Sequence, residues 1–200
     1  MAHKFAEIAF TRTVKQVQEE MGSRSGYSSI ETGPDRNHLL RERERSFIEA
    51  RDSFYIASVS ETGWPYIQHR GGPVGLLKVM GQSTIGFADY SGNRQYVTTG
   101  NVLNNDRVAL FLMDYPNRRR LKLLGRMALV GSDQPLILDD LQDDHYGANV
   151  EKGMLIHVEA FDWNCPQHIT PRYTQAEVEA LLDCGPLTVI NPGLDNRPIN

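Results

Sequence analysis

Residues 54–112 decide the fold of this chain, and they read FYIASVSETGWPYIQHRGGPVGLLKVMGQSTIGFADYSGNRQYVTTGNVLNNDRVALFL. β-Branched and aromatic residues alternate there with turns rich in glycine, asparagine and serine, a pattern typical of short antiparallel strands. The clearest hairpin has the turn Glu61-Thr62-Gly63 between two extended segments. The pattern predicts strands at residues 54–59, 64–68, 75–80, 84–88 and 107–113.

This stretch predicts one helical interruption, at residues 94–104. No regular alternation of strand and helix follows, which argues against a doubly wound parallel sheet. Residues 119–130 and 155–161 predict two more strands, the first with a kink at Gly125. A small antiparallel barrel in a mainly β chain is therefore the predicted fold.

Helices are predicted on both sides of the barrel. Residues 4–21 predict one amphipathic helix, and residues 38–52 predict a second helix with a charged, solvated face. Further helices are expected at residues 134–146 and 174–184, the latter opened by a capping box of Thr174 and Glu177. We expect three parts, namely an N-terminal helical extension, a barrel domain, and a C-terminal helix and tail, at residues 1–52, 53–172 and 173–200.

Composition places the chain among ordinary globular proteins. It has 200 residues, 40% hydrophobic content and a formal charge of −4, which gives no overall attraction to nucleic acid or to anionic membranes. Its two cysteines, Cys165 and Cys184, are too few for a disulfide framework. No apolar run reaches the ~20 residues of a membrane span, and the N-terminus lacks a signal-peptide core. We therefore expect a cytoplasmic protein with no membrane partner.

Two segments of the sheet region are suited to binding an anion. A phosphate needs backbone N–H groups that approach closely and guanidinium groups that neutralise it, and glycine beside arginine at the end of a strand provides both. Ser91-Gly92-Asn93-Arg94 lies between a predicted strand and a helix, for which Asn93 is a good N-cap. Gln68-His69-Arg70-Gly71-Gly72 ends an earlier strand. The alternatives are a solvated turn for the first segment and a surface salt bridge to a glutamate for Arg70.

A third basic segment is Arg118-Arg119-Arg120-Leu121-Lys122. Alternate residues of a strand share a face, so Arg118, Arg120 and Lys122 would point the same way. Such a row of cations can stabilise negative charge on a cofactor, protect a sheet edge, or contact nucleic acid. No aromatic platform for RNA accompanies it, so nucleic acid is the least favoured partner.

Residues 162–168, DWNCPQH, combine aromatic, thiol and imidazole groups. Cys165 and His168 have a spacing that suits a metal, but no second Cys/His pair completes a four-ligand site, so we expect no metal. Trp163, Gln167 and His168 suit either a polar and aromatic rim over a flat ligand or a packed corner. The sequence also lacks the GxSxG, P-loop, HExxH and GxGxxG motifs, which disfavours hydrolases and the common dehydrogenases.

The runs GWPYIQHRGG, GFADYSGNRQYVTTGNVLNNDRVALFLMDYPNRRRLKLLGR and FDWNCPQHITPRY together resemble the pyridoxamine 5′-phosphate oxidase-related, FMN-binding split-barrel family. They are most similar to a subgroup that shares the GNRQY, NRRRLK and DWNCPQH segments. The resemblance covers residues 47–172. It implies a six-stranded antiparallel split β-barrel and a homodimer with FMN in clefts at the dimer interface.

The resemblance also implies a set of cofactor contacts. The family's phosphate motif matches residues 88–95, with Gln95 in place of its lysine, and the family's flavin-contacting glutamine falls at Arg120. Ala88, Asp89 and the backbone of residues 68–72 would line the ring or the ribityl chain. The full predicted cofactor set is Gln68, His69, Arg70, Gly71, Lys78, Ala88, Asp89, Asn93, Arg94, Gln95, Arg120, Trp163, Gln167 and His168.

The substrate implied by the resemblance is less well matched. The oxidases of this family carry an Arg-x-His that grips the substrate phosphate, and here Pro166 stands where the arginine belongs, two residues before His168. Vitamin B6 oxidation is therefore disfavoured. We expect an FMN-dependent oxidoreductase that acts on a small-molecule substrate or reductant, and the alternative is a non-catalytic protein that binds FMN, haem or a deazaflavin as a carrier or sensor.

Overall fold

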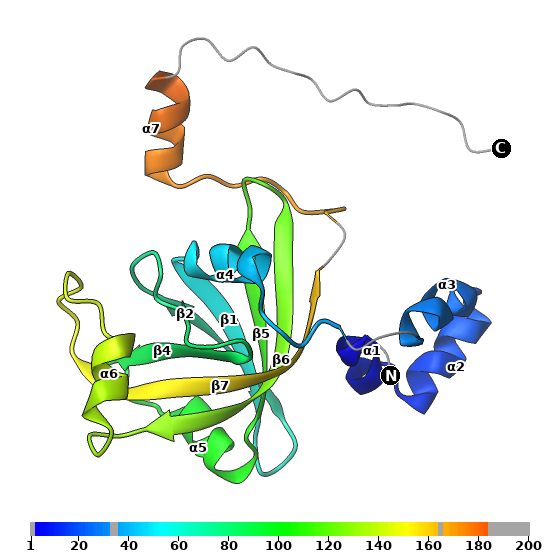
Figure 1. Ribbon diagram of the computed structural model, residues 1–200, viewed down its shortest axis with the longest axis horizontal. Coiled ribbons are helices and arrows are strands. Elements are labelled where there is room, and N and C mark those ends of the chain that lie inside the picture. The colour runs from blue at the N-terminus through cyan, green and yellow to red at the C-terminus, as the bar shows by residue number, and fades with distance from the viewer. Residues whose placement is uncertain (1–2, 33–35, 164–165, 184–200) are drawn as a thin grey trace.

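The computed structural model describes residues 3–32, 36–163 and 166–183. The chain is mainly β, as predicted, and its strands form one antiparallel sheet that curls into a split barrel (Figure 1). The strands are β1 (Ser53–Val59), β2 (Pro65–Gly71), β3 (Lys78–Val79), β4 (Thr84–Tyr90), β5 (Arg107–Asp114), β6 (Arg119–Val130) and β7 (Val150–Trp163).

The strand order of the sheet is β2-β1-β5-β6-β7-β4-β3, so β2 and β3 are its two edges. The family resemblance implied six strands, whereas the residue pattern predicted seven, and the described sheet has seven, of which β3 has only two residues. The longer strand predicted at residues 75–80 is wrong in extent, because the preceding chain turns instead. Gly75 has a φ of +85°, and the N–H of Leu76 donates to the carbonyl of Pro73 at 3.0 Å. Backbone groups used in that turn cannot extend the ladder.

The N-terminal helices form a lobe beside the barrel (Figure 1). One helix was predicted over residues 4–21, but the structure has two, because a new helix starts after Thr11. The hydroxyl of Thr11 accepts from the N–H of Val14 at 3.4 Å, as an N-cap does. The lobe consists of α1 (Lys4–Ala9), α2 (Arg12–Glu20), α3 (Arg24–Ser28) and the 3₁₀ turn η1 (Ser29–Glu31).

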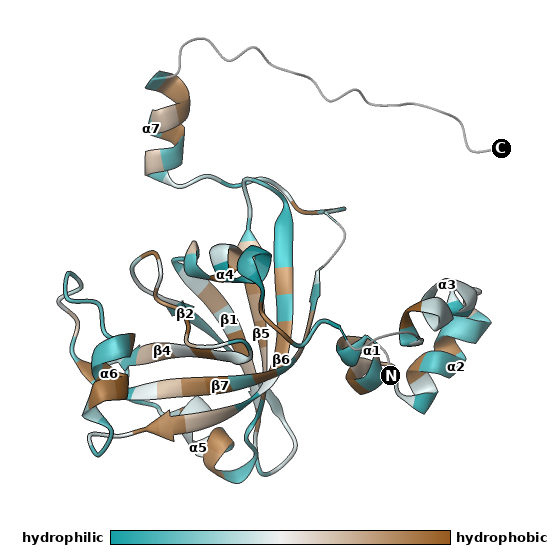
Figure 2. Ribbon diagram, viewed as in Figure 1, coloured by the Kyte–Doolittle hydropathy of each residue, from teal (hydrophilic) through white to brown (hydrophobic). Residues whose placement is uncertain are grey.

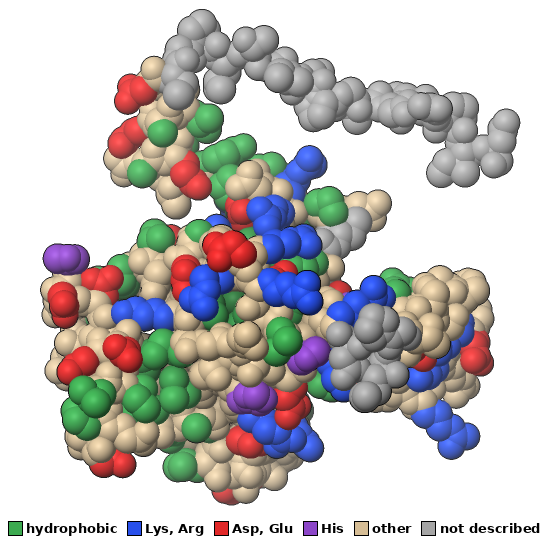
Figure 3. Space-filling model, viewed as in Figure 1, with side chains coloured by type: hydrophobic (Ala, Val, Ile, Leu, Met, Phe, Trp, Pro, Cys, Tyr) green, Lys and Arg blue, Asp and Glu red, His purple; other side chains and the backbone are tan. Residues whose placement is uncertain are grey.

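The second predicted helix is α4 (Glu42–Glu49), which contributes to the barrel core. It starts later than expected, where the Glu44 carboxylate accepts from the N–H of Arg41 at 3.2 Å. Phe47 and Ile48 are buried in the same core cluster as the barrel interior. The outer face of α4 is hydrophilic (Figure 2), and lysine and arginine side chains gather over this region (Figure 3).

Three further helices complete the chain. They are α5 (Val97–Asn104), α6 (Pro135–Leu141) and α7 (Gln175–Asp183). The predicted capping box of α7 is confirmed, since the N–H of Thr174 donates to Glu177 at 2.8 Å and the N–H of Glu177 donates back to the Thr174 hydroxyl at 3.3 Å. The predicted tail and Cys165 lie outside the described residues, and the division into three parts stays a prediction.

The predicted kink at Gly125 is confirmed as an irregularity of the β6–β7 ladder. The register shifts between Leu124 and Gly125. A Cβ at Gly125 would lie 2.5 Å from the carbonyl oxygen of His157. Only glycine lets the two strands approach this closely, and the irregularity bends the sheet as a closing barrel requires.

Strand β2 has two different faces, and this decides where the site lies. Tyr66, Gln68 and Arg70 are partly buried, whereas Ile67 and His69 are exposed. Because successive side chains of a strand point to opposite faces, the first set is directed toward the interior of the barrel and the second away from it. Among the helices that the structure describes, none is long and apolar enough to cross a membrane.

Candidate functional site

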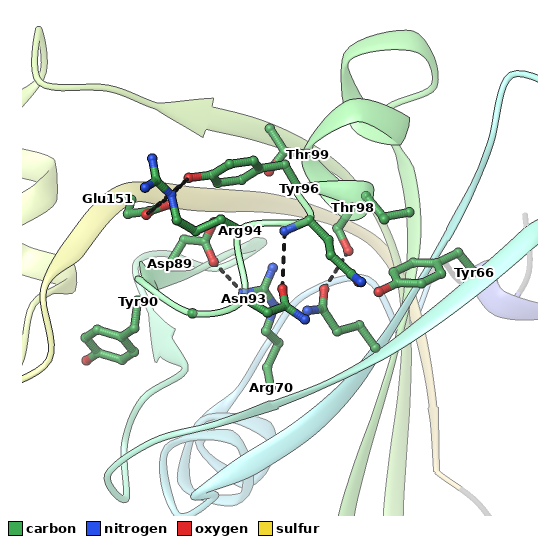
Figure 4. A pocket seen from close by; sticks show the side chains of 14 residues that line it. Tyr66, Arg70, Asp89, Tyr90, Asn93, Arg94, Tyr96, Thr98, Thr99 and Glu151 are labelled. Atoms are coloured by element: carbon green, nitrogen blue, oxygen red, sulfur yellow. Dashed lines mark hydrogen bonds and ion pairs between the residues drawn. The ribbon is translucent and has the colours of Figure 1, made fainter.

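A cavity of about 230 Å³ lies where the barrel is split, between β2 on one side and β4 with the following loop on the other. Its walls come from the inner face of β2, the end of β4, the first turn of α5 and Glu151 of β7 (Figure 4). Six of the predicted cofactor residues line it: Gln68, Arg70, Asp89, Asn93, Arg94 and Gln95. The two anion-suited segments of the sequence therefore meet at one site.

An ion pair between Arg70 and Asp89 spans the split at the base of this cavity (Figure 4). The two side chains are 18% and 7% exposed. This pair replaces the surface salt bridge to a glutamate that was the alternative for Arg70. The Nε of Arg70 is buried and has no hydrogen-bond partner among the described residues, so part of its fork is still available to a ligand.

The loop after β4 has an unusual backbone. Arg94 and Tyr96 have φ values of +58° and +52°, a conformation that costs about 1–2 kcal/mol per residue without a glycine. Arg94 Nε donates to the Tyr96 hydroxyl at 3.0 Å, and that hydroxyl donates to Glu151 at 3.2 Å. The hydrogen bond to Tyr96 raises the pKa of Arg94. Strain of this kind is concentrated at functional sites.

Helix α5 begins at the cavity without a side-chain cap. Its N-cap is Tyr96, and no side chain accepts from the first N–H groups. Asn93 was predicted to be the N-cap, but its side chain instead accepts from the N–H of Gln95 at 3.2 Å. Val97, Thr98 and Thr99 of the first turn line the cavity. The uncapped N–H groups and the positive end of the helix dipole favour an anion there.

The remaining polar groups of the cavity suit hydroxyl-bearing ligands. The Thr98 hydroxyl donates to the Gln68 side chain at 2.9 Å, so the Gln68 amide nitrogen is not used in that bond. Burial raises the pKa of Tyr90, but its ring contacts Tyr146 and its hydroxyl points away from Arg70 and Asn93 (Figure 4). Together the cavity offers guanidinium groups and helix N–H groups beside neutral hydrogen-bonding side chains, which is the donor set that a phosphate ester of a polyol requires.

The structure places four of the predicted cofactor residues outside this cavity but near the barrel strands that form it. His69 is on the outer face of β2, where its ring contacts Tyr55 at a centroid distance of 5.4 Å. Lys78 Nζ donates to the carbonyls of Asp140 and Gln142 at 2.8 and 2.7 Å, at the end of α6. The other two, Gly71 and Ala88, do not line the cavity either.

The four remaining predicted residues, from β6, the end of β7 and the segment after it, lie elsewhere in the chain. Trp163 Nε1 donates to Glu44 at 2.9 Å, and its ring contacts Phe47, so it fastens α4 to the barrel. Arg120 lies on the opposite side of the sheet from the cavity, and Gln167 and His168 are exposed. Their predicted contacts with a cofactor would have to be made to a second subunit.

Sequence reasoning missed several residues of the cavity, chiefly Tyr66, Tyr96, Thr98 and Glu151. Tyr66 could have been found from its alternation with Gln68 and Arg70 along one strand. Glu151 is 55 residues from Tyr96, the residue that it binds, and no local signal relates them. No group of three His, Cys, Asp or Glu side chains suited to a metal occurs within residues 3–32, 36–163 and 166–183.

Comparison with known proteins gives one family and several similar structures. The family model described as pyridoxamine 5′-phosphate oxidase matches residues 40–161. HupZ from Group A Streptococcus has 14% identity and a TM-score of 0.51, and the match covers 68% of this chain and 100% of that chain. An FMN-binding protein from Syntrophomonas wolfei has 12% identity and a TM-score of 0.49, with 76% and 97% covered. Curated proteins give no match.

The Arg70–Asp89 pair predicts an asymmetric response to mutation. Arg70→Met leaves a buried carboxylate without its counter-ion, and we expect it to lower the free energy of unfolding by about 3–5 kcal/mol. Replacing both residues, as Arg70→Met with Asp89→Val, should cost less than Arg70→Met alone, because no charge is then left unpaired. Urea denaturation of the cofactor-free proteins, all at the same protein concentration, measures the free energy of unfolding of both variants.

Arg126→Met is the matched control for this experiment. Arg126 is also paired with carboxylates, those of Asp106 and Glu159, but its side chain is 41% exposed. Exposed pairs contribute about 1 kcal/mol or less. If Arg70→Met costs no more than Arg126→Met, the pair across the split does not hold the barrel closed.

Proposed function

Because this chain belongs to the pyridoxamine 5′-phosphate oxidase family, we propose that it binds FMN in the cavity at the split and serves as an FMN-dependent oxidoreductase. The observation that carries this proposal is the meeting of unused donors at one cavity. These are the buried Nε of Arg70, the terminal nitrogens of Arg94 and the uncapped first turn of α5. A phosphate is the group that such donors bind best.

The residues present fit the phosphate and ribityl part of FMN. Arg94 and the start of α5 would hold the phosphate, while Arg70 would reach it or the ribityl chain through its free Nε. Gln68, Asp89 and Thr98 would bind the ribityl hydroxyls, which both donate and accept. Asp89 adds no net repulsion toward the phosphate, because Arg70 already neutralises it.

The flavin ring needs more room than one subunit offers. The cavity measures about 230 Å³, whereas cavities for ligands of this size measure about 300–1,000 Å³. The ring would therefore extend out of the split and be covered by a second copy of the chain. When bound, the ring supplies the redox chemistry, and this chain's residues orient it and shape the field around it.

The outer face of the sheet suits such a second copy. Tyr55, Ala57, Ile67, Ala109, Phe111 and Leu124 line a hollow of about 530 Å³ on that face. Ile67 is 65% exposed, and a contiguous apolar surface of this kind marks an interface. Since Ile67 lies between Gln68 and Tyr66 on β2, a subunit docked there would adjoin the cavity. We propose a homodimer with FMN at this interface.

Titration with FMN tests the phosphate site. We expect Arg94→Gln to weaken FMN binding by roughly 10- to 100-fold, as the loss of charge-assisted hydrogen bonds predicts. Riboflavin lacks the phosphate, so its affinity should be the same in both proteins. Quenching of flavin fluorescence measures both ligands.

Arg107→Gln is the control for that titration, because Arg107 is exposed and lies outside the cavity. It should bind FMN as the wild-type protein does. No FMN binding by the wild-type protein, or an equal loss of FMN and riboflavin affinity in Arg94→Gln, would count against the proposed site.

Ile67→Asp tests the dimer. A charge in the centre of an apolar interface should convert the protein to monomers and weaken FMN binding by roughly tenfold or more, because the ring loses its cover. Light scattering after size-exclusion chromatography measures the mass. Leu136→Asp is the control, since Leu136 is 79% exposed on α6, away from this face. A dimer that tolerates Ile67→Asp would place the interface elsewhere.

Anaerobic mixing with NADH or NADPH tests whether the bound flavin works in catalysis. We expect the FMN complex to lose the visible absorption of oxidised flavin faster than free FMN does under the same conditions. If the protein only carries or senses the flavin, NADH or NADPH should reduce the bound FMN no faster than it reduces free FMN. That result would favour the non-catalytic alternative while leaving FMN binding intact.

A further inference from the structure

The N-terminal lobe encloses a second cavity against the barrel. This cavity measures about 470 Å³ and lies between α1, α2 and α3 on one side and the ends of β6 and β7 on the other. The barrel side of the cavity falls within or next to the family match at residues 40–161, but the lobe does not. The family's barrel therefore supplies one wall, and this chain's own extension supplies the rest.

Aromatic side chains form part of the wall of this cavity. Phe5 and Phe10 of the α1 region, Tyr27 of α3 and Trp163 of β7 all line it. The rings of Phe10 and Tyr27 contact each other edge to face at a centroid distance of 5.5 Å. Aromatic side chains that line a cavity bind a flat apolar body by burial and ring contact.

Most charges in the cavity already have partners. Lys122 Nζ and Asp162 lie 2.8 Å apart, and His3 Nε2 lies 3.8 Å from the same carboxylate. Burial lowers the pKa of His3, so it is neutral at pH 7. These three groups leave no net charge for a ligand to neutralise.

Arg120 is different. It lines the cavity, and within the described residues its guanidinium has no carboxylate partner and no hydrogen bond, only a ring contact with Phe111 at 5.8 Å. Its Nε is buried without a partner, and so is Nδ1 of His3. Buried polar atoms in native proteins are nearly always satisfied. The Arg120 Nε beside this cavity therefore favours the binding of a polar ligand group there.

A nearby amide extends this set of unused donors. The Gln18 side-chain oxygen accepts a hydrogen bond from Arg24 at 3.1 Å. The amide nitrogen of Gln18 has no partner in the described part of the chain. The cavity thus has one uncompensated cation and additional donors, but its one carboxylate, Asp162, is already paired. An acceptor with a single negative charge would match these donors.

We propose that this cavity binds a small aromatic carboxylate, with its carboxylate on the fork of Arg120 and its ring between the aromatic walls. A planar carboxylate matches the planar guanidinium in two parallel hydrogen bonds. A phosphate dianion fits less well, since only one cation is free and Asp162 lines the same space. This site shares no lining residue with the cavity at the split, although Phe5 and Lys122 also line the apolar hollow on the outer face of the sheet.

The test compares 2-naphthoate with 2-naphthamide, which has the same ring and no charge. Calorimetric titration of the full-length protein should show one naphthoate site per chain, with an affinity at least tenfold higher than that for the amide. Arg120→Gln should reduce naphthoate affinity to the level of the amide and leave the amide unchanged. Phe10→Ala should weaken both ligands, because it removes a wall and no charge.

Two variants keep this test independent of folding. Arg120→Lys retains the charge without the fork and should bind naphthoate with intermediate affinity. Arg118→Gln removes the neighbouring arginine, which does not line the cavity, and should bind as wild type does. Naphthoate affinity that is unchanged in Arg120→Gln, or equal to that of the amide in the wild-type protein, would overturn the proposal.

Competition with FMN separates the two sites. Naphthoate should bind equally well with and without FMN, and equally well to Arg94→Gln, in which the proposed phosphate contact is lost. Stoichiometric displacement of naphthoate by FMN would instead assign Arg120 and this cavity to a flavin, and would overturn the proposal of a separate carboxylate site.

Discussion

The structure depends on how the two sides of the split are held together. No backbone ladder joins β2 to β4, and the ion pair of Arg70 with Asp89 crosses this gap instead. Below it, Phe54 of β1 and Phe87 of β4 pack edge to face at 5.1 Å in the core. Because side chains rather than backbone hydrogen bonds join the two strands, their backbones stay apart. The polar cavity lies in the space between them. In a fully closed barrel the same residues would be buried and inaccessible.

Strand β2 couples this cavity to the opposite surface of the sheet. Its inward residues line the cavity, and its outward residue Ile67 belongs to the apolar hollow. The two surfaces are one strand apart because side chains alternate with a period of two. A second subunit on the outer face would therefore complete the cover of a ligand that extends from the split.

The N-terminal lobe adds a feature that the barrel alone does not have. It covers the end of β6 where Arg120 and Lys122 point outward, and it gives these cations an aromatic enclosure. The basic residues at the start of β6 therefore have different surroundings. Lys122 is neutralised by Asp162, Arg119 lies over the rings of Phe47 and Trp163, and Arg120 has a buried Nε without a hydrogen-bond partner in the described residues. Neighbours in sequence thus have three different physical roles.

The sequence by itself determined the features that depend on short-range chemistry. Alternation located most of the strands, Gly125 marked the bulge, Thr174 and Glu177 marked a helix start, and glycine beside arginine marked both walls of the cavity. Only the tertiary structure decided that Asp89 would bind Arg70, that Lys78 would bind the end of α6, and that Trp163 would bind Glu44, 119 residues away. The local sequence pattern determines which face of a strand a side chain occupies. Its partner depends on strand order, register and curvature, and these arise only when the whole sheet closes on its core.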